Sequence, residues 1–174
     1  YTKKAIDFIR SNKEQQFFLF LSHMYVHTPL HPPSEYLEKS LNGAYGAEVE
    51  HLDDCTGRII DELRELRLDE NTLVIFTSDN GAAEGAGGVN STLRGWKNST
   101  WEGGLRVPCI MRWPNRIASG TECKQVITAM DLYKTIAHLA QVEAPKDRIL
   151  DSKDLSPLFR AQQSQWHPHK YFLY

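Results

Sequence analysis

The fold is decided by residues 72–81, which read TLVIFTSDNG. The apolar part of this stretch is rich in β-branched and aromatic side chains, a composition that favours a buried strand. The polar part, residues 78–81, contains the residue types that tolerate turn geometry best. The stretch therefore predicts a strand over residues 72–77 that passes directly into a turn.

A second apolar run, FFLFL at residues 17–21, is bounded by polar residues and predicts a buried central strand. Between the two runs, from Tyr45 onward, apolar side chains recur at the spacing of an amphipathic helix. These side chains are Val49, Leu52, Ile59, Leu63 and Leu66. Strand, helix and strand in this order are typical of a βαβ unit, so we expect an α/β fold with a largely parallel sheet.

The remaining segments predict shorter elements around one long loop. Helical spacing predicts helices over residues 2–12 and 129–141, and apolar runs predict strands over residues 107–113 and 171–174. The loop, residues 78–106, holds seven of the eleven glycines. A loop of this length in a compact domain is usually functional. Because no repeat or linker interrupts the chain, we expect one folded unit over its whole length.

The composition is that of an ordinary folded protein. Among 174 residues, 20 Lys and Arg oppose 22 Asp and Glu, which gives a net charge of −2. With 41% hydrophobic and 24% charged residues, the chain is not disordered throughout. Its near-neutral charge presents no basic surface to nucleic acid. The longest apolar run, at residues 17–21, is too short to span a bilayer.

The three cysteines, Cys55, Cys109 and Cys123, show no CxxC spacing. Their odd number and their spacing argue against a zinc knuckle and against a disulfide scaffold. We expect two of the three cysteines to be buried thiols, with the third in a different environment. One disulfide with a spare thiol remains the alternative, and the count does not indicate a compartment.

Asp79 and Asn80 form the strongest local signal for chemistry. They follow the strand predicted over residues 72–77, and ligands of open α/β sheets bind outside the carboxyl ends of the strands. A carboxylate and an amide oxygen are hard donors of the kind that Ca²⁺ or Mg²⁺ takes. The alternative is a plain Asp-Asn-Gly turn.

His27 lies in the loop that follows the first predicted strand, and an imidazole there is a candidate general acid or anion contact. The alternative is a solvated loop histidine. His23, His27 and His31 are four residues apart, a spacing that on a helix would suggest a metal-binding face. Prolines within residues 29–33 exclude that helix, so the spacing predicts no metal site.

Lys97 lies among glycines and tryptophans in the long loop, which suits a cation that is presented to an anionic group. Turns at the adjacent glycine pair, residues 103–104, could position Arg106. The alternative is a mobile glycine loop with scattered charges. Two acidic or histidine pairs elsewhere, Asp53-Asp54 and His167-Pro168-His169, are interpreted as solvated surface.

Taken together and in this order, the signals resemble the sulfatase family of the alkaline-phosphatase superfamily, in its arylsulfatase and N-acetylgalactosamine-6-sulfatase type. The resemblance extends over residues 2–174. The stretches that carry it read FFLFLSHMYVHTPLHPP, YGAEVEHLDDCTGRIIDEL, NTLVIFTSDNGAA, LRGWKNSTWEGGLRVPCIMRWP, MDLYKTIAHLAQVEAP and DLSPLF.

The resemblance implies an alkaline-phosphatase-like, largely parallel sheet flanked by helices, and hydrolysis of a sulfate ester on a sugar or aryl group. Asp79 and Asn80 match metal ligands of the family, which usually holds Ca²⁺, with Mg²⁺ as the alternative. Lys97 matches the lysine that contacts the sulfate, and His27 matches a histidine near the ester oxygen. Arg106 matches the arginine of the Gly-Gly-x-Arg segment, which we expect to organise the loop.

The chain also departs from the family pattern. None of its cysteines or serines begins the Cys/Ser-x-Pro-x-Arg motif that yields the formylglycine nucleophile, and the early aspartate pair of metal ligands is absent. We therefore expect the C-terminal portion of a sulfatase catalytic domain, with an incomplete sheet, weak Ca²⁺ binding and no turnover alone. Uncovered sheet edges predict self-association. The family implies an extracytoplasmic location, whether secreted, periplasmic or lysosomal.

Two other functions remain open. The first is a phosphodiesterase or phosphonate hydrolase of the same superfamily, although the single lysine and the Gly-Gly-x-Arg segment favour sulfate. The second is a non-catalytic module that binds sulfated carbohydrate, because Trp96 and Trp101 could stack on sugars.

Overall fold

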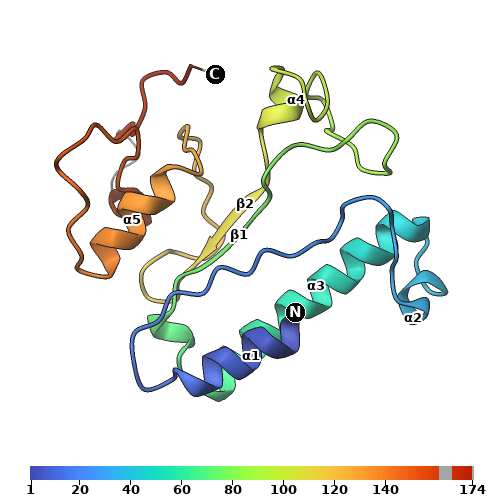
Figure 1. Ribbon diagram of the computed structural model, residues 1–174, viewed down its shortest axis with the longest axis horizontal. Helices are drawn as coiled ribbons and strands as arrows, with labels where there is room; N and C mark the ends of the chain where they lie inside the picture. Colours follow the sequence, from blue (N-terminus) through green and yellow to red (C-terminus); the bar gives the residue numbers. More distant parts are fainter. Residues whose placement is uncertain (161–165, 174) are drawn as a thin grey trace. The chain divides into compact units, whose positions relative to one another are not determined.

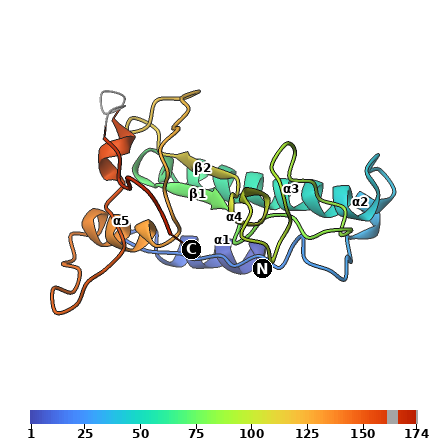
Figure 2. The ribbon, with the colours of Figure 1, turned by 90° about the horizontal axis from the view of Figure 1, so that it is seen from above.

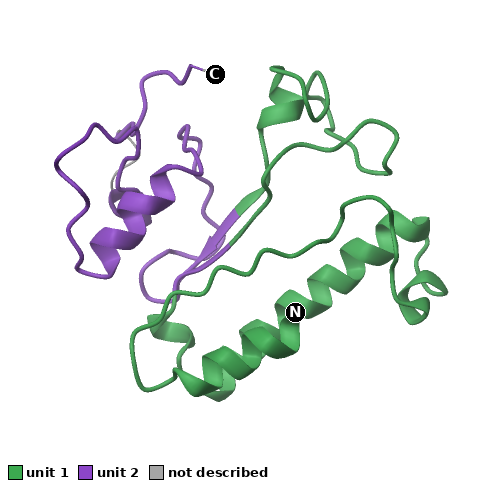
Figure 3. Ribbon diagram, viewed as in Figure 1, with its two compact units in different colours: residues 1–72, 76–109 green, residues 73–75, 110–174 purple. Residues whose placement is uncertain are grey.

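The computed structural model describes residues 1–160 and 166–173. It divides into two compact units, one of residues 1–72 and 76–109 and the other of residues 73–75 and 110–174 (Figure 3). The helices in chain order are α1 (Thr2–Ser11), α2 (Ser34–Leu37), α3 (Gly43–Glu65), η1 (Asp69–Asn71), α4 (Glu102–Leu105), α5 (Asp131–Leu139) and η2 (Ser156–Phe159). The strands are β1 (Val74–Thr77) and β2 (Cys109–Arg112).

In the first unit, α1 packs along the C-terminal half of α3 (Figures 1 and 2). Ala5 and Ile9 lie four residues apart on one face of α1 and are buried, as is Leu63 of α3. Beside them Arg10 donates two hydrogen bonds to the Glu62 carboxylate, at 2.7 and 2.6 Å. The guanidinium holds the pKa of Glu62 below its usual value. The helices predicted over residues 2–12 and from residue 45 are thus confirmed.

The C-terminus of α3 shows how the chain leaves the helix. Arg67 adopts a φ of 58°, in the left-handed region. Its amide donates to the Arg64 carbonyl at 2.9 Å, and the Leu68 amide donates to the Leu63 carbonyl at 2.8 Å. This pair of bonds is a Schellman motif, which satisfies carbonyls that the helix leaves without partners. It ends α3 and leads into η1 and then β1.

The described sheet has two strands, β1 and β2. The Thr77 hydroxyl at the end of β1 donates to the carbonyl of Pro108, just before β2, at 3.0 Å. The end of one strand therefore lies beside the start of the other, so the two run antiparallel. The strands predicted over residues 72–77 and 107–113 are confirmed in shortened form. The larger, mainly parallel sheet stays a prediction.

The segment at residues 17–21 differs from its prediction. It is a stretch of chain outside any strand, between α1 and α2 (Figure 1). Among the described residues, none supplies a backbone hydrogen bond to it. Phe18 and Phe20 are 61% and 77% exposed. The prediction of a buried strand is wrong here because a strand needs a hydrogen-bonded neighbour, whatever its side chains.

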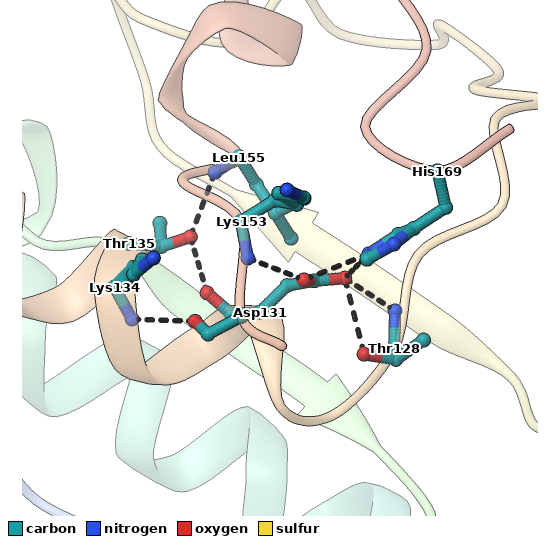
Figure 4. Close-up of polar contacts among 8 residues, drawn as sticks. Thr128, Asp131, Lys134, Thr135, Lys153, Leu155 and His169 are labelled. Carbon is teal, nitrogen blue, oxygen red and sulfur yellow. Dashed lines mark hydrogen bonds and ion pairs between the residues drawn. The ribbon is translucent and has the colours of Figure 1, made fainter. Parts of the chain in front are cut away.

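In the second unit, α5 is organised by Asp131, whose side chain is fully buried (Figure 4). Its carboxylate accepts hydrogen bonds from the backbone amides of Thr128 and Lys153, each at 2.7 Å. The Thr135 hydroxyl donates to the Asp131 carbonyl at 2.7 Å and accepts from the Leu155 amide at 2.8 Å. The helix predicted over residues 129–141 is confirmed, and its first turn anchors the segment at residues 152–155.

Two further expectations are corrected. Residues 171–173 form no strand, and residue 174 lies outside the described residues. Tyr171 and Leu173 are exposed, and a run this short is below the usual length of a strand. The cysteines also differ from expectation, since only Cys55 is buried while Cys109 and Cys123 are exposed.

Within residues 1–160 and 166–173, none of the helices combines the length and apolarity that crossing a membrane requires.

The Thr135 hydroxyl offers a test of this network. We expect Thr135→Val to lower the free energy of unfolding by about 1–3 kcal/mol, because it leaves the buried amide of Leu155 without an acceptor. The matched control is Thr121→Val, since the Thr121 hydroxyl bonds to the Ala118 carbonyl at an exposed turn. Urea unfolding measures both. Equal losses of stability in the two variants would contradict the assignment.

Candidate active site

The site predicted from the sequence lies on the loop that follows β1, at residues 78–106. Asp79 is exposed and Asn80 is half-buried. Within the described part of the chain, neither side chain is engaged in a hydrogen bond or ion pair. Their oxygens are therefore available to a ligand. Lys97 is half-buried, and its ammonium likewise makes no ion pair with a described residue.

Backbone hydrogen bonds tie the start of this loop to its later parts. The Gly81 amide donates to the Gly104 carbonyl at 3.1 Å, and the Lys97 amide donates to the Ala82 carbonyl at 2.9 Å. Gly81 and Ala82 immediately follow Asn80. The loop thus brings the backbone just after the Asp-Asn pair beside the backbones of Lys97 and Gly104.

Glycines make this approach feasible because the backbones meet without side chains between them. A Cβ atom on Gly81 would collide with the carbonyl oxygen of Gly103. A Cβ atom on Gly103 would in turn collide with the carbonyl oxygen of Gly95. In each case the obstructing atom belongs to the backbone and cannot rotate away. Close packing of the backbone therefore requires glycine at positions 81 and 103.

A cation–π contact and an ion pair connect residues within the later part of the loop, residues 94–106. The guanidinium carbon of Arg94 lies 3.6 Å from the ring centroid of Trp101. Arg106, directly after the end of α4, pairs with Glu102 of that helix at 3.3 Å, and both side chains are exposed. Arg106 thus bonds within its own loop, which agrees with an organising role. Arg94 was missed by sequence reasoning because no spacing rule pairs it with a ring seven residues away.

His27 lies on a different segment. Its Nδ1 is 2.6 Å from the Thr28 carbonyl oxygen. A carbonyl only accepts, so the ring donates from Nδ1, and Nε2 remains for another partner. The loop predicted after residues 17–21 is confirmed, because residues 22–33 form no helix or strand. Among the described residues, no hydrogen bond or ion pair joins His27 to Asp79, Asn80 or Lys97.

The neighbouring histidines have separate surroundings. The His23 Nδ1 accepts the Tyr25 amide at 3.2 Å. Burial lowers the pKa of His23, and the charge of His51 lowers it further. The His31 backbone amide donates to the buried Glu48 carboxylate at 2.6 Å. Throughout the described residues, no group of three His, Cys, Asp or Glu side chains could hold a metal ion.

The structure also tests whether Asp53-Asp54 and His167-Pro168-His169 lie on the surface, as the sequence analysis expects. Asp53 and Asp54 are exposed, as expected. His169 is not on the surface: its side chain is 9% exposed, and its Nε2 lies 2.9 Å from both carboxylate oxygens of Asp131. The surface interpretation of His169 is wrong because its partner is 38 residues away in the sequence. His167 is exposed.

Residues 1–142 match the family model for sulfatases. The chain belongs to the sulfatase family. It is 44% identical over 172 residues to mouse steryl-sulfatase, across 93% of this chain and 28% of that protein. It is 39% identical over 178 residues to mouse N-acetylgalactosamine-6-sulfatase, across 99% of this chain and 34% of that protein. The chain therefore spans about a third of the length of the curated relatives it matches.

Solved sulfatase structures agree with this assignment. The structure of Ps i-CgsB in complex with k-i-k-neocarrahexaose superposes with a TM-score of 0.85 at 32% identity, across 91% of this chain and 37% of that one. The PsFucS1 sulfatase from Pseudoalteromonas sp. superposes with a TM-score of 0.86 at 30% identity, across 91% of this chain and 33% of that one. The expected family is thus confirmed, and this family uses a divalent metal.

The residues present fit part of such a metal site. Asp79 and Asn80 are consecutive oxygen donors without competing partners among the described residues. Ca²⁺ takes about six to eight oxygen ligands, so two side chains supply only a minority of them. Other parts of a complete site would have to supply the rest.

We expect Gly81→Ala to disrupt the loop and to lower the free energy of unfolding by about 1–3 kcal/mol, because the added methyl meets a backbone carbonyl. The matched control is Gly57→Ala in α3, where a Cβ atom has open space and helix propensity favours alanine. Thermal unfolding measures stability, and tryptophan fluorescence reports on Trp96 and Trp101. A loop that tolerates Gly81→Ala as well as Gly57→Ala would contradict the close packing.

Proposed function

We propose that this chain is the C-terminal portion of a sulfatase catalytic domain whose parent hydrolyses sulfate esters of a sugar or aryl group. The observation that supports the proposal is the backbone hydrogen bond from Lys97 to Ala82, two residues after the Asp79-Asn80 pair. The Asp79 carboxylate and the Asn80 amide oxygen suit a divalent cation, and the Lys97 ammonium suits an anionic ester.

Each of these residues has a defined task in this proposal. Asp79 and Asn80 would hold a divalent cation, Ca²⁺ or Mg²⁺, and the chemistry that such an ion would supply there is polarisation of a sulfate oxygen. The Lys97 ammonium binds a sulfate oxygen and orients the ester. A nucleophile from outside this chain attacks sulfur, the bond from sulfur to the ester oxygen breaks, and that oxygen takes the Nε2 proton of a doubly protonated His27, whose Nδ1 proton stays hydrogen-bonded to the Thr28 carbonyl. Arg106 keeps the loop in shape through Glu102.

Two alternatives receive less support. A phosphodiesterase or phosphonate hydrolase shares the metal chemistry, but the relatives that match most of this chain are named sulfatases. A carbohydrate-binding module would use Trp96 and Trp101 as stacking platforms. Arg94 already covers one face of Trp101, which leaves that ring less suited to a sugar. We further propose an extracytoplasmic location, in keeping with the family.

The test uses the full-length protein that contains this chain and chromogenic sulfate and phosphate esters. We expect hydrolysis of the sulfate ester, and a loss of about 10²–10³-fold in kcat/KM in Lys97→Ala, because one charge that stabilises the transition state is removed. Lys39→Ala, an exposed lysine of the same unit, is the control. The isolated 174-residue chain should be inactive. Faster turnover of the phosphate ester, or turnover by the isolated chain, would contradict the proposal.

We also propose that the isolated chain self-associates through residues 17–21. These residues lack backbone partners among those described, and Phe18 and Phe20 lie exposed. Antiparallel pairing of two copies about Leu19 would place Phe18 of one copy opposite Phe20 of the other, as a pair of aromatic contacts. An exposed apolar segment whose backbone groups lack partners among the described residues is prone to such pairing.

We expect light scattering of the isolated chain to show dimers or larger species. The double variant Phe18→Lys with Phe20→Lys should shift it toward monomer, because like charges would then face each other. Leu41→Lys, at a residue that is 97% exposed in the same unit, is the control. A monomer at high concentration in the unmodified chain would overturn this proposal.

A further inference from the structure

Asn90 lies in the same loop as Asp79, Asn80 and Lys97 but has no role in the hydrolysis proposed above. Its Oδ1 accepts the Ala82 backbone amide at 2.9 Å, and its Nδ2 donates to the Gly95 carbonyl at 2.9 Å. The same Nδ2 lies 3.5 Å from the Ala82 carbonyl. Asn90 is half-buried, and one side chain thereby joins three parts of the loop that are separated in sequence.

The residues that Asn90 joins are neighbours of the proposed active-site groups. Ala82 lies two residues after Asn80, and Gly95 lies two residues before Lys97. The Ala82 carbonyl accepts the Lys97 amide at 2.9 Å. The Ala82 amide bonds to Asn90 while its carbonyl bonds to Lys97, so Ala82 is fixed from both sides.

Only an amide satisfies this arrangement. Asn90 must accept at one end and donate at the other, over the short reach of a single methylene group. Aspartate has the same shape but offers no donor, so a carboxylate oxygen would face the Gly95 carbonyl. Alanine would leave the Ala82 amide and the Gly95 carbonyl without this partner.

We propose that Asn90 is a positioning residue that sets the separation between the Asp79-Asn80 pair and Lys97. The inference rests on the proposed function, because it assigns Asn90 to the geometry of that same site. Its effect passes through Lys97: without the bridge, the Lys97 backbone is no longer fixed beside Ala82, two residues after the Asp79-Asn80 pair. A displacement of about 1 Å in a positioned group is enough to lower a rate about 10²-fold.

The first test examines the bridge in the isolated chain, without reference to activity. Asn90→Asp should speed hydrogen exchange at the Ala82 and Lys97 amides at least tenfold, because both amides belong to the bridged arrangement. The matched control is Asn98→Asp in the same loop, where the asparagine is exposed and its side chain bridges nothing among the described residues. Unchanged exchange in Asn90→Asp would overturn the inference.

The second test is a double-mutant cycle on sulfate-ester hydrolysis by the full-length protein. Asn90→Asp should lower kcat/KM about 10–100-fold when Lys97 is present, and less than about twofold in the Lys97→Ala background. Asn98→Asp should leave kcat/KM unchanged both when Lys97 is present and in the Lys97→Ala background. A residue that only supported folding would lower activity equally in both backgrounds, and that result would overturn the positioning role.

The outcomes separate the inference from the function on which it rests. If Lys97→Ala retains full activity, or if the full-length protein hydrolyses no sulfate ester, the proposed function fails. If Lys97→Ala is impaired while Asn90→Asp behaves like Asn98→Asp, the function stands and the role of Asn90 is refuted.

Discussion

The close approach of the backbone at Gly81 to the backbone at Gly103 and Gly104 is the constraint on which the candidate site depends. Two parts of a long loop meet there with no side chain between them, and a hydrogen bond of 3.1 Å joins Gly81 to Gly104. Because Gly81 directly follows Asn80, this contact fixes where the Asp-Asn pair lies on the loop. A loop that would otherwise sample many conformations becomes a surface that presents defined groups.

The rest of the loop follows from that contact. With Gly81 and Ala82 fixed, the amide of Lys97 reaches the Ala82 carbonyl, and the side chain of Asn90 spans from Ala82 to Gly95. These bonds use backbone atoms almost entirely. Among the described residues, the side chains of Asp79, Asn80 and Lys97 take no part in these bonds, and in our proposal they bind an anion and a divalent cation.

The sequence predicted what local patterns control. Helical spacing located α1, α3 and α5, and the apolar run before Ser78 located β1, because these signals need only neighbouring residues. The segment at residues 17–21 carries an equally strong apolar signal but forms no strand, since pairing depends on a partner elsewhere. Asn90 and the His169–Asp131 pair escaped prediction for the same reason: each acts through a contact that no sequence spacing reveals.

The metal site that we propose at Asp79 and Asn80 would be partial within this chain. The chain spans about a third of its curated relatives, and its two oxygen donors are fewer than a Ca²⁺ site needs. The most direct measurement is a crystal structure of the full-length protein with Ca²⁺ and a sulfate ester analogue. The account predicts Asp79 and Asn80 oxygens about 2.3–2.6 Å from the ion and the Lys97 ammonium in hydrogen-bond contact with the sulfate. An ion bound elsewhere, with Asp79, Asn80 and Lys97 facing solvent, would contradict it.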